Sequence, residues 1–177
     1  MNSDIKKWLQ KISKNSLSRI GIKPGMKVLD FGAREGYNTL PAAKIVNTEG
    51  KVIAVDEDEK ALNTLKEKAS KKSIDNIEII NNNGKSNFDI QDNSIDFVIL
   101  FDVFHELQGS DKYIKKLQRI LKNKGILSVF DPHVKSKKKM KDKITSYNFP
   151  LKDNLKVELL HNYKLMIVEV NNFIYTI

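Results

Sequence analysis

The stretch VLDFGAREGYNT, residues 28–39, decides how this chain folds. An apolar run ends at Asp30, and the two glycines Gly32 and Gly36 follow it closely. This pattern predicts a strand that stops at the acid, a tight turn, and a helix that opens near Gly36. In α/β sheets such a turn lies at the carboxyl edge of the strands, where ligands bind. The stretch therefore predicts a nucleotide-type binding loop.

Apolar runs alternate with helical patterns on the C-terminal side of this stretch, and an amphipathic helix precedes it. Strands that alternate with helices predict a parallel sheet covered by helices on both faces. Asp58 and Asp111 stand where helix N-caps belong. The predicted strands are Met26–Phe31, Lys51–Asp56, Ile77–Asn81, Ile95–Phe101 and Gly125–Asp131, and the predicted helices are 3–19, Asn38–Asn47, Asp58–Lys72 and Asp111–Leu121.

The C-terminal part of the chain has a different pattern. Two strand-like runs, Leu155–Leu160 and Lys164–Val170, are joined by HNY, and no helix fits between them. They should therefore pair antiparallel at one edge of the sheet. The pattern predicts a single α/β domain over residues 1–177, with parallel strands that end in an antiparallel hairpin.

Composition excludes several classes of protein and site. No apolar run is long enough to span a membrane and the N-terminus lacks a signal-peptide core, so we expect a cytoplasmic protein with no membrane partner. The absence of cysteine excludes disulfides, thiolate metal sites and a cysteine nucleophile. The three histidines stand far apart in the sequence, so we expect no metal site.

The net charge of +9 raises the question of a nucleic-acid partner. Lysine far outnumbers arginine, whereas base and phosphate recognition usually recruits arginine. The segment Lys135–Lys143 carries six lysines. This segment is either a solvated helix face or a patch that attracts a polyanionic substrate such as RNA.

The first turn differs from loops that hold phosphate. It lacks the G-x-G-x-x-G spacing, and a carboxylate precedes its glycines. Asp56 ends the next apolar run about twenty residues later, at the spacing that binds ribose hydroxyls. A nucleoside with free ribose hydroxyls and no pyrophosphate at the turn fits both features. S-adenosylmethionine is such a ligand: its ammonium suits Asp30, and its carboxylate suits the amides of residues 36–39.

Four stretches of the chain resemble, in order and spacing, successive motifs of the class I S-adenosylmethionine-dependent methyltransferases, and most closely the small ubiquinone/menaquinone-biosynthesis-like group. They are VLDFGAREG, VIAVDED, NIEIINNNGKSNFDIQDNSIDFVILFDVFHEL and LQRILKNKGILSVFD, within residues 24–131. The resemblance implies a three-layer Rossmann-like sandwich with a seven-stranded, mostly parallel sheet. It also implies an enzyme that uses S-adenosylmethionine and releases S-adenosylhomocysteine.

The resemblance assigns cofactor contacts position by position. The glycine turn would lie beneath the methionine moiety, Asp56 would bind the ribose, and Glu57 would flank the adenine. Where the family often has an acid that meets the adenine amino group, this chain has Asn83. The residues assigned to the cofactor are Asp30, Gly32, Ala33, Gly36, Asn38, Asp56, Glu57, Asn83, Gly84, Phe101 and Asp102.

Arg34 departs from the family, which usually has a glycine at this position. If the backbone there needs a positive φ, a side chain costs about 1–2 kcal/mol. Arg34 then either points to solvent or pairs with the cofactor carboxylate. A third alternative is that the cofactor site has decayed and the chain is an inactive nucleoside-binding module.

Candidates for acting on the methyl acceptor follow the fourth and fifth predicted strands. His105 is our candidate general base, because histidine titrates near neutral pH. The alternative is a histidine that packs over the cofactor with no role in proton transfer. The other candidates are Asp102, Glu106, Asp131 and His133.

The acceptor itself stays open. We expect a small-molecule acceptor, and the alternative is an RNA or protein substrate bound through Lys135–Lys143. The segment 1–22 would act as a partial lid, and residues 132–150 would form a substrate-side segment. The protein would be a monomer or a homodimer in which the partner closes the pocket.

Overall fold

The computed structural model describes residues 14–86, 88–107, 111–131, 133, 138, 142, 144, 146, 157–160 and 163–169. The chain separates into two compact units, Met1–Phe88 and Asp89–Ile177. The expectation of a single domain over residues 1–177 stays a prediction. No helix in the described part of the chain is long and apolar enough to span a membrane.

The first unit contains three parallel strands in the order β3-β2-β1. β1 is Lys27–Phe31, β2 is Lys51–Asp56 and β3 is Ile77–Asn81. The sequence predicts β2 and β3 with these bounds and places the start of β1 one residue earlier. The register pairs Asp56 at the end of β2 with Asn81 at the end of β3, so the strands end at one edge.

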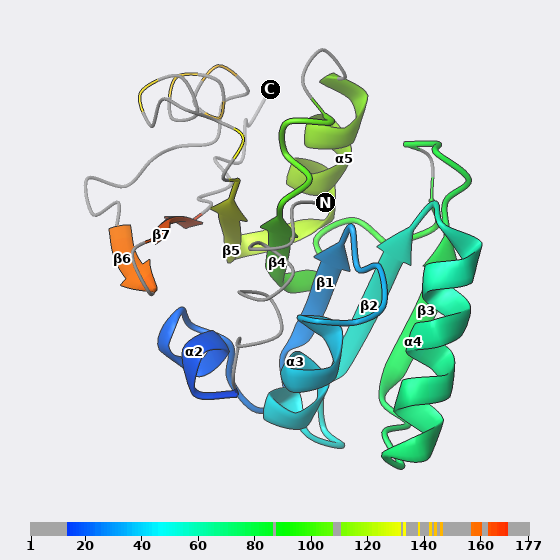
Figure 1. Ribbon diagram of the computed structural model, residues 1–177. Coiled ribbons are helices and arrows are strands. Elements are labelled where there is room, and N and C mark those ends of the chain that lie inside the picture. The colour runs from blue at the N-terminus through cyan, green and yellow to red at the C-terminus, as the bar shows by residue number, and fades with distance from the viewer. Residues whose placement is uncertain are drawn as a thin grey trace. The chain divides into compact units, whose positions relative to one another are not determined.

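Helices pack against these strands (Figure 1). α3, Thr39–Val46, lies against β1 and β2, and α4, Glu59–Lys71, lies against β2 and β3. α2, Lys14–Arg19, covers the described part of the helix predicted over residues 3–19, and the rest of that prediction lies outside the described residues. The proposed lid over residues 1–22 likewise falls mostly outside them.

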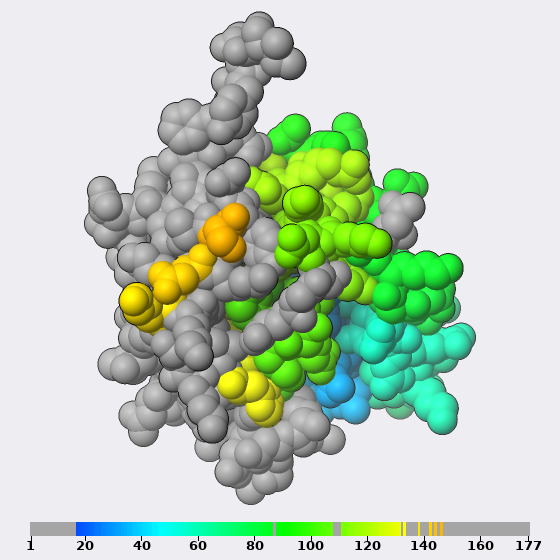
Figure 2. Space-filling model, turned by 90° about the horizontal axis from the view of Figure 1, so that it is seen from above, coloured from blue at the N-terminus to red at the C-terminus, as the bar shows by residue number. Residues whose placement is uncertain are grey.

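α4 shows how the sequence determines a helix and its buried face. The side chain of Asp58 accepts a hydrogen bond from the backbone N of Ala61, which confirms the predicted N-cap. Leu62 and Leu65 are buried against the sheet, where they pack with Ala54 of β2. The opposite side of the helix is exposed and rich in lysine and glutamate. The helix itself lies at the surface in the space-filling view of Figure 2.

The second unit contains β4 (Ile95–Phe101) and β5 (Leu121–Phe130), which pair in parallel. β7 (Tyr163–Glu169) pairs antiparallel with β5, and β6 (Val157–Leu160) pairs antiparallel with β7. The helix α5, Asp111–Ile120, packs on β5.

Several predicted boundaries in this unit differ from the structure, most of all the start of β5 and the role of Asp111. β5 begins at Leu121 rather than at Gly125, because Leu121 already pairs with Ile95 across an irregularity in the register. Asp111 is the first residue of α5 rather than the N-cap before it. The α/β Rossmann-like class is confirmed by the parallel strands and the helices between them. The three layers and the joining of seven strands in one sheet stay predictions.

Replacing Gly36 with alanine should destabilise the protein more than replacing Gly25. Both glycines have a positive φ, +84° and +77°, so each alanine adds a backbone cost of about 1–2 kcal/mol. A Cβ at Gly36 would also clash with Cδ1 of the buried Leu65, whereas a Cβ at Gly25 meets nothing within 4 Å.

The difference between the two variants therefore isolates the steric clash, which costs about 1–3 kcal/mol in a packed core. Urea unfolding of Gly36→Ala and Gly25→Ala measures it. Equal losses in the free energy of unfolding would show that Leu65 moves aside at no cost.

Candidate functional site

The glycine turn after β1 is held to β2 by its backbone. The backbone N atoms of Gly32 and Ala33 both donate to the carbonyl of Val55, at 2.9 and 3.1 Å. Gly32, Arg34 and Gly36 have φ values of +79°, +47° and +84°. Arg34 therefore carries a side chain at a position with positive φ, for which we predict a cost of about 1–2 kcal/mol.

Asp56 connects this turn to the end of β2. Its Oδ2 accepts a hydrogen bond from the backbone N of Arg34 at 2.7 Å, and its Oδ1 accepts one from the backbone N of Asp58 at 2.9 Å. Each carboxylate oxygen has a second lone pair, so both oxygens can still accept hydrogen bonds from a ligand. The residue Arg34 is itself exposed, which agrees with a side chain that points to solvent.

Asp30 lies in the interior, with 1% of its surface exposed. The hydroxyl of Thr39, the first residue of α3, donates to its Oδ2 at 2.5 Å. Burial raises the pKa of Asp30 to about 7, although the hydrogen bond from Thr39 opposes the shift. Asp30 therefore connects the end of β1 to the start of α3. The sequence pattern did not reveal this contact with Thr39.

Two buried oxygens beside the turn accept no hydrogen bond within the described residues. They are Oδ1 of Asp30 and Oδ1 of Asn38, and Asn38 is 5% exposed. A buried acceptor without a donor costs about 1–3 kcal/mol. A ligand group that donates hydrogen bonds, such as an ammonium, would relieve this cost. The prediction that Asp30 and Asn38 serve the cofactor is compatible with this arrangement and stays a prediction.

The structure also brings the ends of β2 and β3 together. A Cβ at Gly84 would lie 2.8 Å from Oε2 of Glu57, so the glycine lets that side chain approach. Asn83, with φ +48°, donates from its backbone N to Oδ1 of Asn81 at 2.8 Å. Glu57, Asn83 and Gly84 are all exposed.

The remaining predicted residues lie in the second unit. The ring of Phe101 packs edge-on against Phe130, with 6.0 Å between ring centroids, and Phe101 is 4% exposed. Asp102 has φ +58°, and its backbone N donates to the carbonyl of Phe130 at 2.7 Å. This strained backbone turns the chain at the carboxyl end of β4. The assignment of Phe101 and Asp102 to the methionine end stays a prediction.

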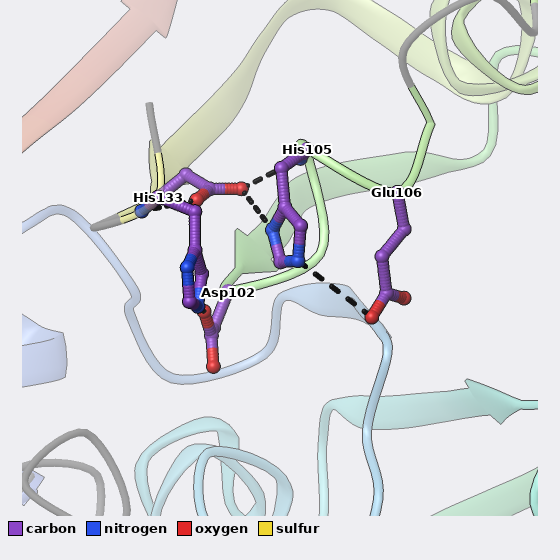
Figure 3. Close-up of polar contacts among 5 residues, drawn as sticks. Asp102, His105, Glu106 and His133 are labelled. Atoms are coloured by element: carbon purple, nitrogen blue, oxygen red, sulfur yellow. Dashed lines mark hydrogen bonds and ion pairs between the residues drawn. The ribbon is translucent and has the colours of Figure 1, made fainter. Parts of the chain in front are cut away.

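Asp131 positions two histidines (Figure 3). Its Oδ2 accepts from the backbone N of His105 at 2.7 Å and lies 2.9 Å from Nδ1 of the same residue. Its Oδ1 accepts from the backbone N of His133 at 2.9 Å. The Asp131 side chain is fully buried, whereas 30% of the His105 side chain is exposed. If Nδ1 carries the proton, Asp131 fixes this tautomer and leaves Nε2 as the free acceptor.

The sequence offered Asp131 and His105 as separate candidates and missed their contact. A usable signal was available, since the residues follow β4 and β5 and adjacent parallel strands end at the same edge. Most of the basic segment Lys135–Lys143 and of the substrate-side segment 132–150 lies outside the described residues.

Comparison with known proteins gives one family. A family model described as a methyltransferase domain matches residues 22–170. The demethylmenaquinone methyltransferase of Staphylococcus aureus is 27% identical over 122 residues, which are 69% of this chain and 48% of that protein. The chain thus spans about half the length of the curated relatives it matches.

Two solved structures show the same architecture. A SAM-dependent methyltransferase from Aquifex aeolicus has a TM-score of 0.79 and 26% identity, and the match covers 94% of this chain and 97% of that one. A SAM-dependent O-methyltransferase from Thermotoga maritima has a TM-score of 0.66 and 16% identity, over 90% of this chain and 65% of that one. At 16% identity the second likeness concerns the fold alone.

Asp30→Asn should change how stability depends on pH. The pKa of Asp30 is raised from 3.8 to about 7, so the folded state holds a proton that the unfolded state has released between about pH 4 and pH 7. The cost of burying the charge is absent below this range and fully present above it. The free energy of unfolding of the wild type, relative to Asp30→Asn, should therefore fall as pH rises from about 4 to about 7.

Urea unfolding at several pH values measures this difference. Asp75→Asn, which changes an exposed carboxylate of the same unit, serves as the matched control. A wild-type minus Asp30→Asn difference that stays level across the range would show that Asp30 is ionised at no cost.

Proposed function

The chain belongs to the class I S-adenosylmethionine-dependent methyltransferase domain family, and we propose that it transfers the methyl group of S-adenosylmethionine to a small-molecule acceptor. One observation carries the proposal: a glycine turn whose backbone is bound to the Asp56 carboxylate, with two buried oxygens beside it that accept no hydrogen bond within the described residues.

The donor set of the first unit fits this cofactor. Oδ1 of Asp30 and Oδ1 of Asn38 are acceptors that suit an ammonium, and Asp56 keeps free lone pairs for ribose hydroxyls. Gly32 and Gly36, with φ +79° and +84°, and Ala33 between them form the turn that we assign to the methionine end of the cofactor. At the adenine end, Glu57, Asn83 and Gly84 are exposed. Asn83 offers polar groups to the adenine but, unlike the acid that the family often has there, no negative charge.

Bound S-adenosylmethionine supplies a methyl group that its sulfonium already activates. The protein then has to hold and orient the two reactants, and it needs a base only where the acceptor must lose a proton. We assign that proton to Nε2 of His105, because Asp131 holds the other ring nitrogen at 2.9 Å. Phe101 and Asp102 complete the proposed set as residues of the methionine end.

The small-molecule acceptor is supported by a relative. The Staphylococcus aureus protein is named for the methylation of demethylmenaquinone, which is a small molecule. We do not assign that compound to this chain, which spans about half of that relative.

Asp56→Asn should weaken the binding of S-adenosylmethionine. A hydrogen bond to a charged group contributes about 1.5–3 kcal/mol, so we expect a Kd about 10–100 times higher. Titration calorimetry with S-adenosylmethionine and S-adenosylhomocysteine measures it. Asp75→Asn is the control, because Asp75 precedes β3 and lies at the opposite end of the strands.

Asp56 also binds the backbone of Arg34 and Asp58, so urea unfolding of the same variant separates a lost ligand contact from a lost turn. An unchanged Kd in a folded Asp56→Asn protein would exclude the ribose assignment. Wild-type protein that gives no heat with millimolar S-adenosylmethionine would exclude the proposed function.

His105→Ala should lower kcat by about 10²–10⁴ and leave the Kd of S-adenosylmethionine unchanged, because a general base acts in the chemical step. The measurement needs an acceptor, which screening of small hydroxyl-, amino- and thiol-bearing compounds can supply. Asp92→Asn, which changes an exposed carboxylate that precedes β4, is the control. Wild-type turnover in His105→Ala would reduce His105 to a packing residue.

A further inference from the structure

Three side chains of the second unit converge at the carboxyl ends of its parallel strands. Asp102 and His105 follow β4, and His133 follows β5. One ligand atom from each lies within 4.8 Å of the others (Figure 3). We propose that Asp102, His105 and His133 bind a divalent transition-metal ion of the zinc type.

The contact between His133 and Asp102 has the spacing of neighbouring ligands on one ion, and the His105 ligand atom lies within 4.8 Å of both. Donor atoms about 2.1 Å from a tetrahedral ion lie about 3.4 Å from one another. Nε2 of His133 lies 3.3 Å from Oδ1 of Asp102, and Nε2 of His105 lies 3.8 Å from Oε1 of Glu106. Glu106 is therefore within reach as a further oxygen ligand on the exposed side of the cluster.

The buried Asp131 supplies the outer support that metal-binding histidines usually have. A ligating histidine commonly donates its second ring N–H to a carboxylate, which fixes the tautomer and the orientation of the ring. Asp131 lies 2.9 Å from Nδ1 of His105 and leaves Nε2 to face an ion. It also accepts from the backbone N of His133, so one carboxylate positions both histidines.

The ligand types indicate which ions fit. Two imidazoles and one carboxylate favour Zn²⁺, Co²⁺ or Fe²⁺ over Mg²⁺ and Ca²⁺, which prefer all-oxygen sites. The side chains of His105 and His133 are 30% and 45% exposed, so an ion between them can keep a position for an outside ligand. An oxygen of the methyl acceptor is a suitable ligand for that position.

This inference rests on the proposed function only for the identity of that outside ligand. With an ion bound, His105 is a ligand and no longer the base, and the ion itself would lower the pKa of an acceptor hydroxyl. The assignment also gives the Asp102 carboxylate to the metal rather than to the methionine end of the cofactor.

The competing explanation is an ion pair between His133 and Asp102 beside a separate contact between His105 and Asp131. Titration with Co²⁺ distinguishes the two, because the ion reports its coordination by visible absorption. The full chain without an affinity tag is treated with chelator and titrated with Co²⁺ and then with Zn²⁺. We expect one Co²⁺ per chain, displaced by Zn²⁺ and unaffected by millimolar Mg²⁺.

Variants assign the ligands. His133→Gln should abolish the Co²⁺ spectrum, and Asp131→Asn should weaken the affinity about 10–100-fold, as loss of an outer partner does. Asp92→Asn, at the opposite end of β4 from Asp102, should bind as the wild type does. Far-UV circular dichroism and urea unfolding of each variant show whether it is folded.

Absence of stoichiometric Co²⁺ and Zn²⁺ binding in the wild type overturns the inference, and so does equal binding by folded His133→Gln. Calorimetry with S-adenosylmethionine on the same preparations tests the proposed function separately. Loss of cofactor binding with retained Co²⁺ binding would reject the methyl-transfer proposal and leave the metal site standing.

Discussion

The contact between the Asp56 carboxylate and the backbone of the glycine turn is the constraint on which the rest of the first unit depends. The turn leaves β1 with three residues at positive φ, and one of them, Arg34, carries a side chain. Such a backbone persists only where its surroundings hold it. Asp56 holds the turn by accepting a hydrogen bond from the backbone N of Arg34 at 2.7 Å. The carbonyl of Val55 also holds it, by accepting from the backbone N atoms of Gly32 and Ala33.

With the proposed ribose contact, Asp56 has two functions at once: it holds the turn and it binds the ligand. If Asp56 only held the turn, any side chain of similar length that accepts a hydrogen bond could replace it. A carboxylate that also keeps lone pairs toward a ligand needs both oxygens in place before the ligand arrives. The hydrogen bonds from the backbone fix the Asp56 carboxylate before the ligand binds. The proposed ribose acceptor is therefore already oriented, which lowers the entropy lost on binding.

The buried carboxylates of Asp30 and Asp131 differ in their surroundings. Burial raises the pKa of Asp30 to about 7, although hydrogen bonds from Thr39 and Asn38 oppose the shift. Asp131 is equally enclosed but accepts three contacts, two from backbone N atoms and one from the His105 ring. These contacts fix the Asp131 carboxylate relative to the two histidines. Asp131 is therefore suited to hold its neighbours in place, whereas Asp30 is suited to receive a cation.

The sequence by itself determined the order of the strands and helices, the glycine turn and the position of Asp56, because hydrophobic periodicity and chain order depend on neighbours along the chain. It also led to the family, which four motifs in register identify. Only the tertiary structure decided that Thr39 donates to Asp30 and that Asp131 positions His105 and His133. The histidines 28 positions apart in the numbering (133 − 105) looked unrelated, and we expected no metal site from them. The pairing of β4 with β5 brings their carboxyl ends together, and sequence distance carries no information about that proximity.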